Sequence, residues 1–534
     1  MAVTAEAAPR TVVPERHRLV DALFAPTDIA ILVYFRVAFG ILIAWEAVRG
    51  LLHHQVPLLL HANLLFTYWP FTFVKLMPSP LMYGVEIMLV VAGVFMALGF
   101  YYRLSAIAVF VGSTYLFLLD SGRYLNHIYL VCLLAFLMIF LPANRRWSLD
   151  ARFDPSIRRD EVPAWTLWLL RFQIAVPYFF GGLAKLNGDW FRGQPLHSML
   201  LVHRDFPLLG HYFTNRWFFD FLNWGSLLLD LLVVLALLNR YTRVPAYMAA
   251  IAFHLMNARF FHIGIFPFLM IAATALFFPA DWPRRVVNDA RTRPLPRPFR
   301  RFVIGFVIGA ALALYLPNER TLIFSLVGGI GGGVVGYYFE IPPPRKPRLP
   351  APRATAAPHK KLVVGILAVW VALQLLLPLR HFVLPGNVYW TESGERFAWF
   401  MMLRNKAGTT TFVLRNPQNG KTQDIDPRDF LQPIQMVFMT GSPDLTVQFA
   451  HYLSDRAQRE EHLSVRPQVF VRTMISLNRR PPQPFIDPTV DLARVNRPFI
   501  NAPKWVIPLR PRTSAPYQAP SQGDIDKSAS ASAG

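Results

Sequence analysis

Long runs of apolar residues, separated by short polar loops, occupy most of the chain between residues 28 and 380. Runs of about 17–25 mostly apolar residues match the thickness of the hydrocarbon core of a bilayer. The pattern predicts membrane-spanning helices at 28–50, 82–100, 104–120, 126–143, 164–186, 219–239, 244–257, 261–279, 302–317, 321–338 and 362–379. Because the seventh run is short and has polar flanks, we expect about 9–11 spans.

The pattern changes after residue 387. The segment TTTFVLRNPQNGKTQDI predicts two short strands joined by a turn, residues 427–460 have a helical pattern, and PQVFVRTMISLN predicts another strand. We therefore expect a polytopic α-helical membrane domain at 28–380, followed by a smaller β-rich extramembrane domain at 387–511. The remaining parts are a polar N-terminal segment (1–27), a Pro/Arg-rich linker (341–361) and a tail (512–534) whose composition is typical of disorder.

Arginine clusters indicate the orientation of the chain in the membrane. They lie in the loops 144–163 and 283–301 and in the linker 340–361, and with eleven spans all three fall on one side. The positive-inside rule makes that side cytoplasmic. The N-terminus is then expected in the cytoplasm and the C-terminal domain outside it. The same arginines account for the net charge of +22, so the charge does not imply a nucleic-acid partner. The chain also has no base-stacking or groove-reading motif.

Composition limits the available chemistry. Only 16% of the residues are charged, against about a quarter in soluble chains. The chain has a single cysteine, Cys132, within an apolar run, so it has no internal disulfide and no CxxC redox pair. No metal-ligand spacing such as HExxH occurs, and we expect no metal site. Redox work would therefore need an organic cofactor or another protein.

Ionisable residues within spans are costly to bury, and each is a functional candidate. Lys185 ends the fifth span after Gly181 and Gly182. It could extend its ammonium to the lipid headgroups, or act as a base if apolar surroundings keep the amine neutral. We expect the other polar residues near the same face to be His127, Asn126, His254 and Asn257. Asp230 lies mid-span and is expected to be protonated or paired.

Seven strings along the chain carry a family resemblance. They are NHIYL, RFQIAVPYFFGGLAKLNGDWFRG, FHLMN with HIGIF, PADWPRR, LPLRHFVLPGNVYWTESGERFAWFMM and FIDPTVDL. In these strings the sequence resembles the vitamin K-dependent gamma-glutamyl carboxylase family, related to the horizontally transferred transmembrane domain proteins. The resemblance covers roughly residues 25–510.

The resemblance implies roles for matching residues. Lys185 corresponds to the lysine that deprotonates vitamin K hydroquinone, and His127 to the histidine that assists it, with Asn126 as its expected hydrogen-bond partner. In the family, reduced vitamin K (a menaquinol-type naphthohydroquinone) reacts with O₂ to give a strong base, which removes a γ-proton from a peptide glutamate before CO₂ adds. We expect the cofactor-binding residues to be Tyr178, His254, Asn257, Phe261, Trp399, Met401 and Met402, although packing alone also explains the apolar ones.

Three functions fit the pattern. The first is a carboxylase-like membrane enzyme that couples epoxidation of a reduced naphthoquinone to carboxylation of peptide glutamate. The second is a quinone epoxidase that does not carboxylate. The third is a non-enzymatic transporter or scaffold, against which the chain has no internal repeat, and its polar candidates gather near one face of the bilayer. The expected partners are the lipid bilayer and, for the first function, a glutamate-containing peptide.

Overall fold

The structure is a computed structural model. It describes residues 20–292 (apart from 205, 207–208 and 262), 359–497 and 503–512. The predicted spans at 302–317 and 321–338 lie outside the described residues, as do residues 1–19, nearly all of the linker and the tail after residue 512.

Long apolar helices confirm a multi-pass membrane protein. Within the described residues, six helices are long and apolar enough to span a bilayer, or up to seven if a bent pair is one span. The six are α2 (Ala30–Leu52), α4 (Ser79–Leu98), α5 (Tyr102–Leu119), α8 (Trp165–Lys185), α11 (Arg216–Leu238) and α17 (Lys360–Leu379). They pack with α6 (Asn126–Phe140), α12 (Arg243–Phe261) and α13 (Phe266–Thr274).

The predicted span at 261–279 starts too early, because Phe261 is the last residue of α12 and the next apolar helix runs from Phe266 to Phe277. A bend follows that helix. Residues Phe266–Phe277 and Trp282–Asn288 meet at 93°, and the second piece begins α14 (Trp282–Thr292). Pro279 and Pro283 stand at the bend, where each lacks the backbone N–H that a continuous helix needs. Shorter helices connect the spans: α3 (Gln55–Leu60), α7 (Leu149–Phe153), α9 (Gly188–Phe191) and α10 (Leu196–Leu201).

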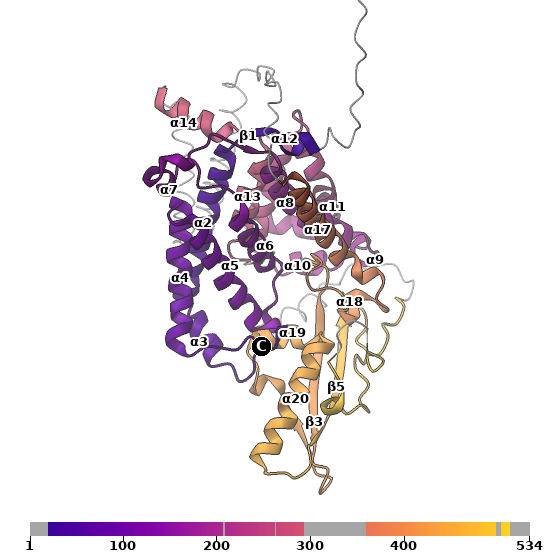
Figure 1. Cartoon of the computed structure of the whole chain (residues 1–534). Coiled ribbons are helices and arrows are strands. Elements are labelled where there is room, and N and C mark those ends of the chain that lie inside the picture. The colour runs from indigo at the N-terminus through magenta and orange to yellow at the C-terminus, as the bar shows by residue number, and fades with distance from the viewer. Residues whose placement is uncertain are drawn as a thin grey trace, which may run out of the picture.

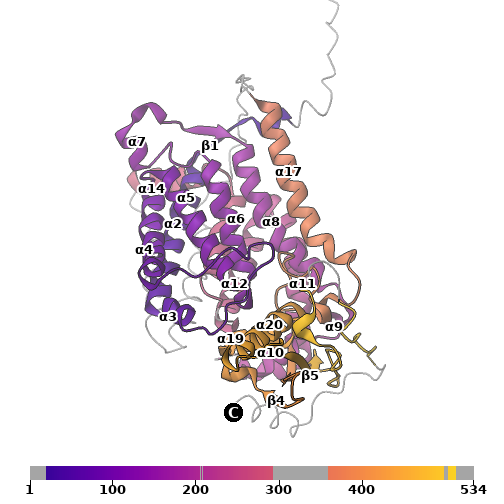
Figure 2. The same ribbon diagram turned by 60° about the horizontal axis from the view of Figure 1, so that its bottom comes forward.

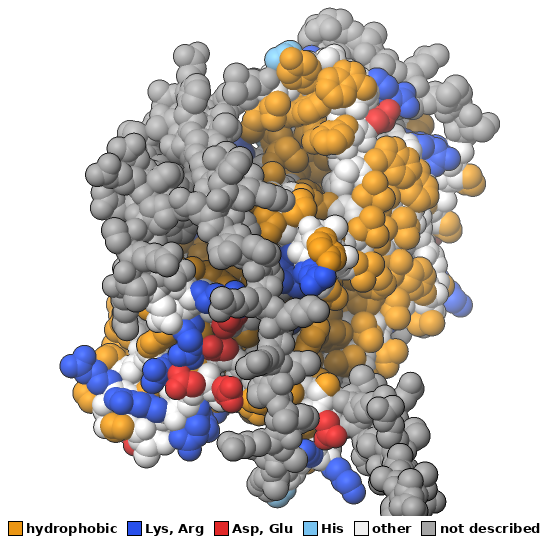
Figure 3. All heavy atoms as spheres, turned by 90° about the horizontal axis from the view of Figure 1, so that it is seen from above, with side chains coloured by type: hydrophobic (Ala, Val, Ile, Leu, Met, Phe, Trp, Pro, Cys, Tyr) orange, Lys and Arg blue, Asp and Glu red, His pale blue; other side chains and the backbone are white. Residues whose placement is uncertain are grey.

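One end of the bundle is rich in arginine. There β1 (Pro26–Asp28) pairs with β2 (Glu161–Pro163), and Arg284 forms ion pairs with Asp28 at 2.7 Å and Asp160 at 2.9 Å. We call this the arginine-rich end; it carries β1, α7 and α14 at the top of Figure 1. Figure 3 looks down onto this end; on the part not drawn in grey, hydrophobic side chains cover a broad area and most charged ones gather beside it.

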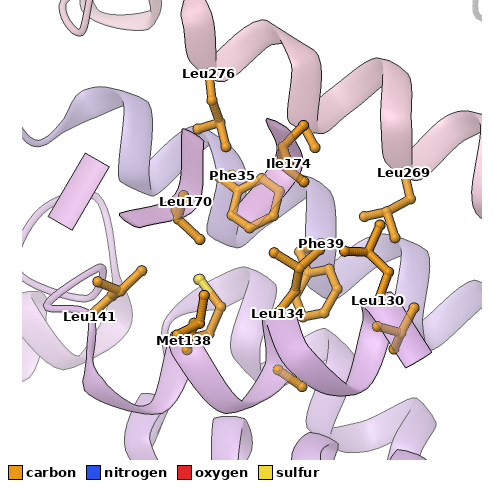
Figure 4. Close-up of a cluster of buried hydrophobic side chains, with 14 of the residues drawn as sticks. Phe35, Phe39, Leu130, Leu134, Met138, Leu141, Leu170, Ile174, Leu269 and Leu276 are labelled. Atoms are coloured by element: carbon orange, nitrogen blue, oxygen red, sulfur yellow. The ribbon is translucent and has the colours of Figure 1, made fainter. Parts of the chain in front are cut away.

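The membrane domain is held together by close packing of its apolar helices. Side chains of α2, α6, α8 and α13, among them Phe39, Leu134, Ile174 and Leu269, interlock in one buried cluster (Figure 4). A polar contact joins α17 to α8: Gln374 of α17 accepts a hydrogen bond from Gln173 of α8 at 3.2 Å. Packing and buried polar contacts are what hold helices together in lipid, where apolar side chains gain little by leaving the solvent.

The C-terminal domain contains an antiparallel sheet ordered β4-β3-β5, as the pattern predicted for its strands. These are β3 (Lys406–Arg415), β4 (Thr422–Ile425) and β5 (Gln468–Leu477). In register, Phe412 pairs with Ile425 and Val471. The helices of the domain are α18 (Val388–Thr391), α19 (Pro433–Thr440) and α20 (Pro443–Glu460). The sheet and α20 share a core that includes Phe412, Phe449 and Val471.

This domain is attached to the end of the bundle opposite the arginine-rich end, which we call the domain end (Figures 1 and 2). Asp189, just after α8, accepts hydrogen bonds from Arg480 at 2.5 Å and Asn478 at 2.9 Å. Asp120, just after α5, accepts one from Gln435 at 2.9 Å. The loops of the membrane domain therefore hold the C-terminal domain over the outer turns of α5, α6 and α8.

Candidate active site at the domain end

Lys185 is the last residue of α8, and its side chain points into the protein. Its Nζ donates to Asp230 Oδ2 of α11 at 2.7 Å and to the Ser226 carbonyl at 3.4 Å. The Lys185 side chain is 7% exposed and that of Asp230 is 8% exposed. The lysine is thus neither extended toward lipid headgroups nor solvated. It forms a buried pair with a carboxylate from the neighbouring helix.

One face of α8 carries the polar residues of the site. Tyr178 lies two turns before Lys185, so both side chains project from the same face. The Tyr178 hydroxyl is 2.7 Å from His254 Nε2 of α12 and 3.1 Å from Thr274 Oγ1 of α13. The hydroxyl therefore joins three helices at the level just below the lysine.

Gly181 and Gly182 lie between them and permit close approach. A methyl group on Gly182 would lie 2.8 Å from the Leu231 side chain and 3.0 Å from its backbone nitrogen, so this glycine lets α11 pack against α8. A methyl group on Gly181 would lie 3.3 Å from Met401 Cε and 3.6 Å from Asp230 Oδ2. Gly182 therefore serves helix packing, while Gly181 faces the site.

Aromatic rings surround the lysine. Its Nζ lies 4.8 Å from the centre of the Trp190 ring and 5.7 Å from that of Phe253. Several buried polar atoms nearby have no hydrogen-bond partner within the described residues: His254 Nδ1, Asn223 Oδ1 and Trp190 Nε1. Unsatisfied buried polar atoms are rare, and they are often found where a ligand binds. These rings and unpaired polar atoms suit a flat ligand that carries polar groups.

His127 lies in the first turn of α6 and is 9% exposed. Its ring is 5.6 Å from the ring of Phe266, and the His254 ring is 5.9 Å from the same phenylalanine. Phe266 thus links His127 to the Tyr178–His254 pair. The imidazole has no hydrogen bond to any other described residue, which leaves both of its nitrogens available to a ligand.

A segment of the C-terminal domain, residues 396–403, inserts over the outer turns of α6 and α8. The Phe397 backbone N–H donates to the Tyr124 hydroxyl at 2.7 Å. The Trp399 ring lies 5.2 Å from that of Tyr129, and Met401 approaches Gly181. Trp399 is 1% exposed. We call residues 396–403 the covering segment, because it shields the site from solvent.

The backbone of the covering segment is strained at three positions. Phe397 and Trp399 both have φ of 63°, and Met402 has φ of 55°. The left-handed region costs a non-glycine residue about 1–2 kcal/mol. Such strain persists where the surrounding structure fixes the chain, and it gathers at functional sites.

A tyrosine outside the spans closes the end of α8. Tyr389 of α18 donates its hydroxyl to the Ala184 carbonyl at 2.6 Å and accepts from Asn187 at 3.1 Å. Burial raises the pKa of Tyr389 to about 12, so the hydroxyl stays protonated and remains a donor. The last turn of α8, which carries Lys185, is therefore fixed by the C-terminal domain.

Some predicted residues do not join this arrangement. Asn126 was expected to bond to His127, but its side chain accepts from the Tyr124 hydroxyl and donates to the Phe400 carbonyl, both at 2.9 Å. It holds the covering segment instead. Phe261 packs beside Phe260 in a separate cluster. Met402 is 40% exposed. Asn257, about one turn after Phe253 on α12, is half-buried.

Sequence reasoning did not place Asn223, Trp190, Phe253 or Phe266 in the site. A signal was present for the first of these. Asn223, Ser226 and Asp230 follow one another at intervals of three and four residues, which places them on one face of α11. Trp190, Phe253 and Phe266 carry no comparable signal, because aromatic residues are common throughout the chain. No group of three or more potential metal-binding side chains occurs among the described residues.

Two family models match the chain. The model of the HTTM domain matches residues 24–282, and the model of the vitamin K-dependent gamma-carboxylase lumenal domain matches residues 359–512. The first match includes Lys185, His127 and Asp230, and the second includes the covering segment. No solved structure matches the chain.

Proposed function

Since the chain belongs to the vitamin K-dependent gamma-carboxylase family, we propose that it oxidises a reduced naphthoquinone and uses that oxidation to carboxylate peptide glutamate. The observation that carries the proposal is the buried Lys185–Asp230 pair beneath the covering segment. A carboxylase-like function follows from the family. The coupled oxidation, the glutamate substrate and the roles of single residues are the proposal.

The pair explains how a buried lysine can act as a base. An ammonium and a carboxylate 2.7 Å apart can share one proton, so a neutral amine beside a neutral carboxyl group needs no net charge in the interior. In that form the Lys185 Nζ carries a lone pair and can accept a hydroxyl proton from the hydroquinone. The charge of the ammonium that results is balanced by the hydroquinone anion, while Asp230 holds the Lys185 side chain in place.

The surrounding residues orient the ligand and exclude water. The rings of Trp190 and Phe253 offer flat apolar surfaces beside the amine, and His254 Nδ1 offers an unused hydrogen-bonding atom. His127 provides a second imidazole across Phe266. When bound, the reduced naphthoquinone would supply, with O₂, the oxidation chemistry and the strong base that glutamate requires. The covering segment keeps the site dry, which preserves that base.

Direction across the membrane is also a proposal. The arginine-rich end carries the short basic loops and is assigned to the cytoplasm by the positive-inside rule. The N-terminus would then be cytoplasmic, and both the site and the C-terminal domain would face the other side. The name of the lumenal-domain match agrees with this direction.

The first test measures quinone epoxide formation by the purified full chain in detergent, with reduced vitamin K and O₂. Lys185→Ala should lower turnover by about 10²–10⁴-fold, the usual contribution of a general base. Lys421→Ala, at an exposed lysine of the C-terminal domain, should turn over like the wild type. Equal turnover in Lys185→Ala and Lys421→Ala would remove the lysine from the mechanism.

A second test separates carboxylation from oxidation alone. The wild type is supplied with reduced vitamin K, labelled CO₂ and glutamate-containing peptides, and label in the peptide is compared with epoxide formed. Label that appears with epoxide and is lost in Lys185→Ala supports the coupled reaction. Epoxide without label across acidic peptides would make the protein a quinone epoxidase.

A further inference from the structure

A cavity of about 300 Å³ opens at the arginine-rich end, at the opposite end of the bundle from Lys185. It is lined by Arg103, Asn144, Arg145, Ser156, Ile157 and Arg159. These residues come from the first turn of α5 and from the loop that joins α6 to α8. The size is at the lower end of the range for small-ligand pockets.

The three arginines of this cavity have no acidic partner among the described residues. Arg159 donates to the Ser156 carbonyl at 3.1 Å and the Arg158 carbonyl at 2.7 Å, and Arg103 donates to the Ile139 carbonyl. Burial, with repulsion from Arg159 and Arg103, lowers the pKa of Arg145. Three like charges in one hollow repel one another, and an anion bound between them would remove that repulsion.

The carboxylates beside the cavity residues are engaged elsewhere. Asp154 accepts hydrogen bonds from the backbone N–H of Ser156 at 3.0 Å and from its hydroxyl at 2.6 Å, and Asp160 pairs with Arg146 and Arg284. Asp150 accepts hydrogen bonds from the backbone N–H groups of Tyr101 at 2.8 Å and Tyr102 at 3.1 Å, and from Asn144 at 2.8 Å. It therefore caps the first turn of α5 and is not free to neutralise the arginines. The positive charge of the cavity remains available to a ligand.

The cavity lies where the apolar surface of the bundle ends. Next to Arg103 on α5, Leu104 is 65% exposed and Ile107 is 43% exposed, and Phe140 at the end of α6 is 54% exposed. Apolar side chains this exposed on spanning helices face lipid tails. An arginine one residue nearer the end of the helix is then at the depth of the lipid headgroups.

We propose that this cavity binds the phosphate group of an anionic phospholipid, with Arg145 and Arg159 as its main ligands. Guanidinium groups bind phosphate oxygens through paired N–H donors, and basic pockets at the ends of spanning helices bind anionic headgroups. The acyl chains of such a lipid would lie along the exposed Leu104 and Ile107. The site is separate from the quinone chemistry, and its test does not depend on enzyme activity.

A neighbouring cavity of about 210 Å³ is a weaker candidate. It is lined by Arg146, Trp147, Ser148, Ala151, Arg152 and Arg158. Arg146 is paired with Asp160 at 3.2 Å, and Arg158 donates to the Ala151 carbonyl at 2.8 Å. Its arginines are therefore largely satisfied by the protein, and we assign the headgroup to the larger cavity.

The experiment titrates the purified full chain, in a non-ionic detergent, with phosphatidylglycerol or phosphatidylcholine and follows bound lipid by native mass spectrometry and the thermal unfolding midpoint. We expect phosphatidylglycerol to bind and raise the midpoint, and phosphatidylcholine to have no such effect. Arg145→Gln/Arg159→Gln should bind phosphatidylglycerol about tenfold or more weakly, because two charge-assisted contacts are lost. Arg285→Gln is the control, since Arg285 lies at the same end, paired with Asp281 and 56% exposed.

Competition with inorganic phosphate tests whether the cavity recognises the phosphate group of the lipid. Competition by millimolar phosphate in the wild type, absent from the double variant, supports the site and shows that it recognises the phosphate group itself. If the double variant fails to fold, Arg145→Lys gives the same information, since it keeps the charge and loses the paired donors. Equal affinity for phosphatidylglycerol in the wild type and in every cavity variant would overturn the proposal.

Discussion

Gly182→Ala should separate α8 from α11 and weaken the Lys185–Asp230 pair. The added methyl group would lie 2.8 Å from the Leu231 side chain and 3.0 Å from its backbone nitrogen, and the backbone atom cannot move aside independently of its helix. Overpacking of this kind costs about 1–3 kcal/mol. Replacing glycine by alanine inside a helix contributes up to about 1 kcal/mol in the opposite direction.

The net effect expected for Gly182→Ala is therefore a loss of about 1–2 kcal/mol. Gly181→Ala is the matched control on the same helix, one residue earlier. Its methyl group would meet the flexible end of Met401 at 3.3 Å, so little must move and stability should stay within about 0.5 kcal/mol of the wild type.

The assay compares thermal unfolding midpoints of the three proteins in one detergent, together with epoxide formation at a temperature where all are folded. Gly182→Ala should unfold several degrees earlier and turn over more slowly, because a shift of α11 moves Asp230 away from the lysine. Gly181→Ala should match the wild-type midpoint. Equal midpoints and equal turnover for the two alanine variants would refute the reasoning.

Three further predictions concern the charged groups. Asp230→Asn removes the carboxyl group that shares a proton with Lys185 and should lower the free energy of unfolding by about 1–3 kcal/mol, measured by chemical unfolding; an unchanged value would show that the pair does not stabilise the fold. Although burial alone would raise the pKa of Glu392, Arg404 and Lys406 outweigh it and hold that pKa below its usual 4.5. The carboxylate therefore stabilises the fold above about pH 4.5 and loses this effect as pH falls, so Glu392→Gln should show less stability change between pH 6 and pH 3.5 than the wild type; parallel curves would contradict this. Asp189→Asn weakens the contact with Arg480 by about 1.5–3 kcal/mol and should speed proteolytic release of the C-terminal domain, whereas cleavage at the wild-type rate would mean that other contacts hold the domain.

Much of the fold can be predicted from the sequence, because the membrane imposes a strong pattern. The apolar runs locate α2, α4, α5, α8 and α11 to within a few residues, and the Asn-Pro-Gln-Asn-Gly turn locates the β3–β4 hairpin. The predicted span 261–279 ends at the bend after α13 but starts too early, since Phe261 is the last residue of α12 and α13 begins at Phe266; hydropathy does not register so short a break between two apolar helices.

The site could be predicted only in part. Lys185 and His127 stand out because an ionisable residue in an apolar run is unusual. The partner of the lysine depends on how α8 and α11 pack, which is a tertiary property, so Asp230 was expected to be protonated or paired but was not named as the partner. The covering segment lies more than 200 residues after Lys185, and only docking of the C-terminal domain places Trp399 and Met401 beside α8. The partner of Asn126 could not be predicted for the same reason, since Phe400 belongs to that segment.

The most direct test of the central claim is epoxide formation by Lys185→Arg. A guanidinium keeps the positive charge beside Asp230 but cannot be deprotonated in a protein, so this variant separates the ion pair from the base. With a wild-type unfolding midpoint, the variant should form epoxide at least about 10²-fold more slowly. Turnover close to that of the wild type in a folded Lys185→Arg protein would mean that the lysine serves only to pair with Asp230, and the base would have to be sought elsewhere.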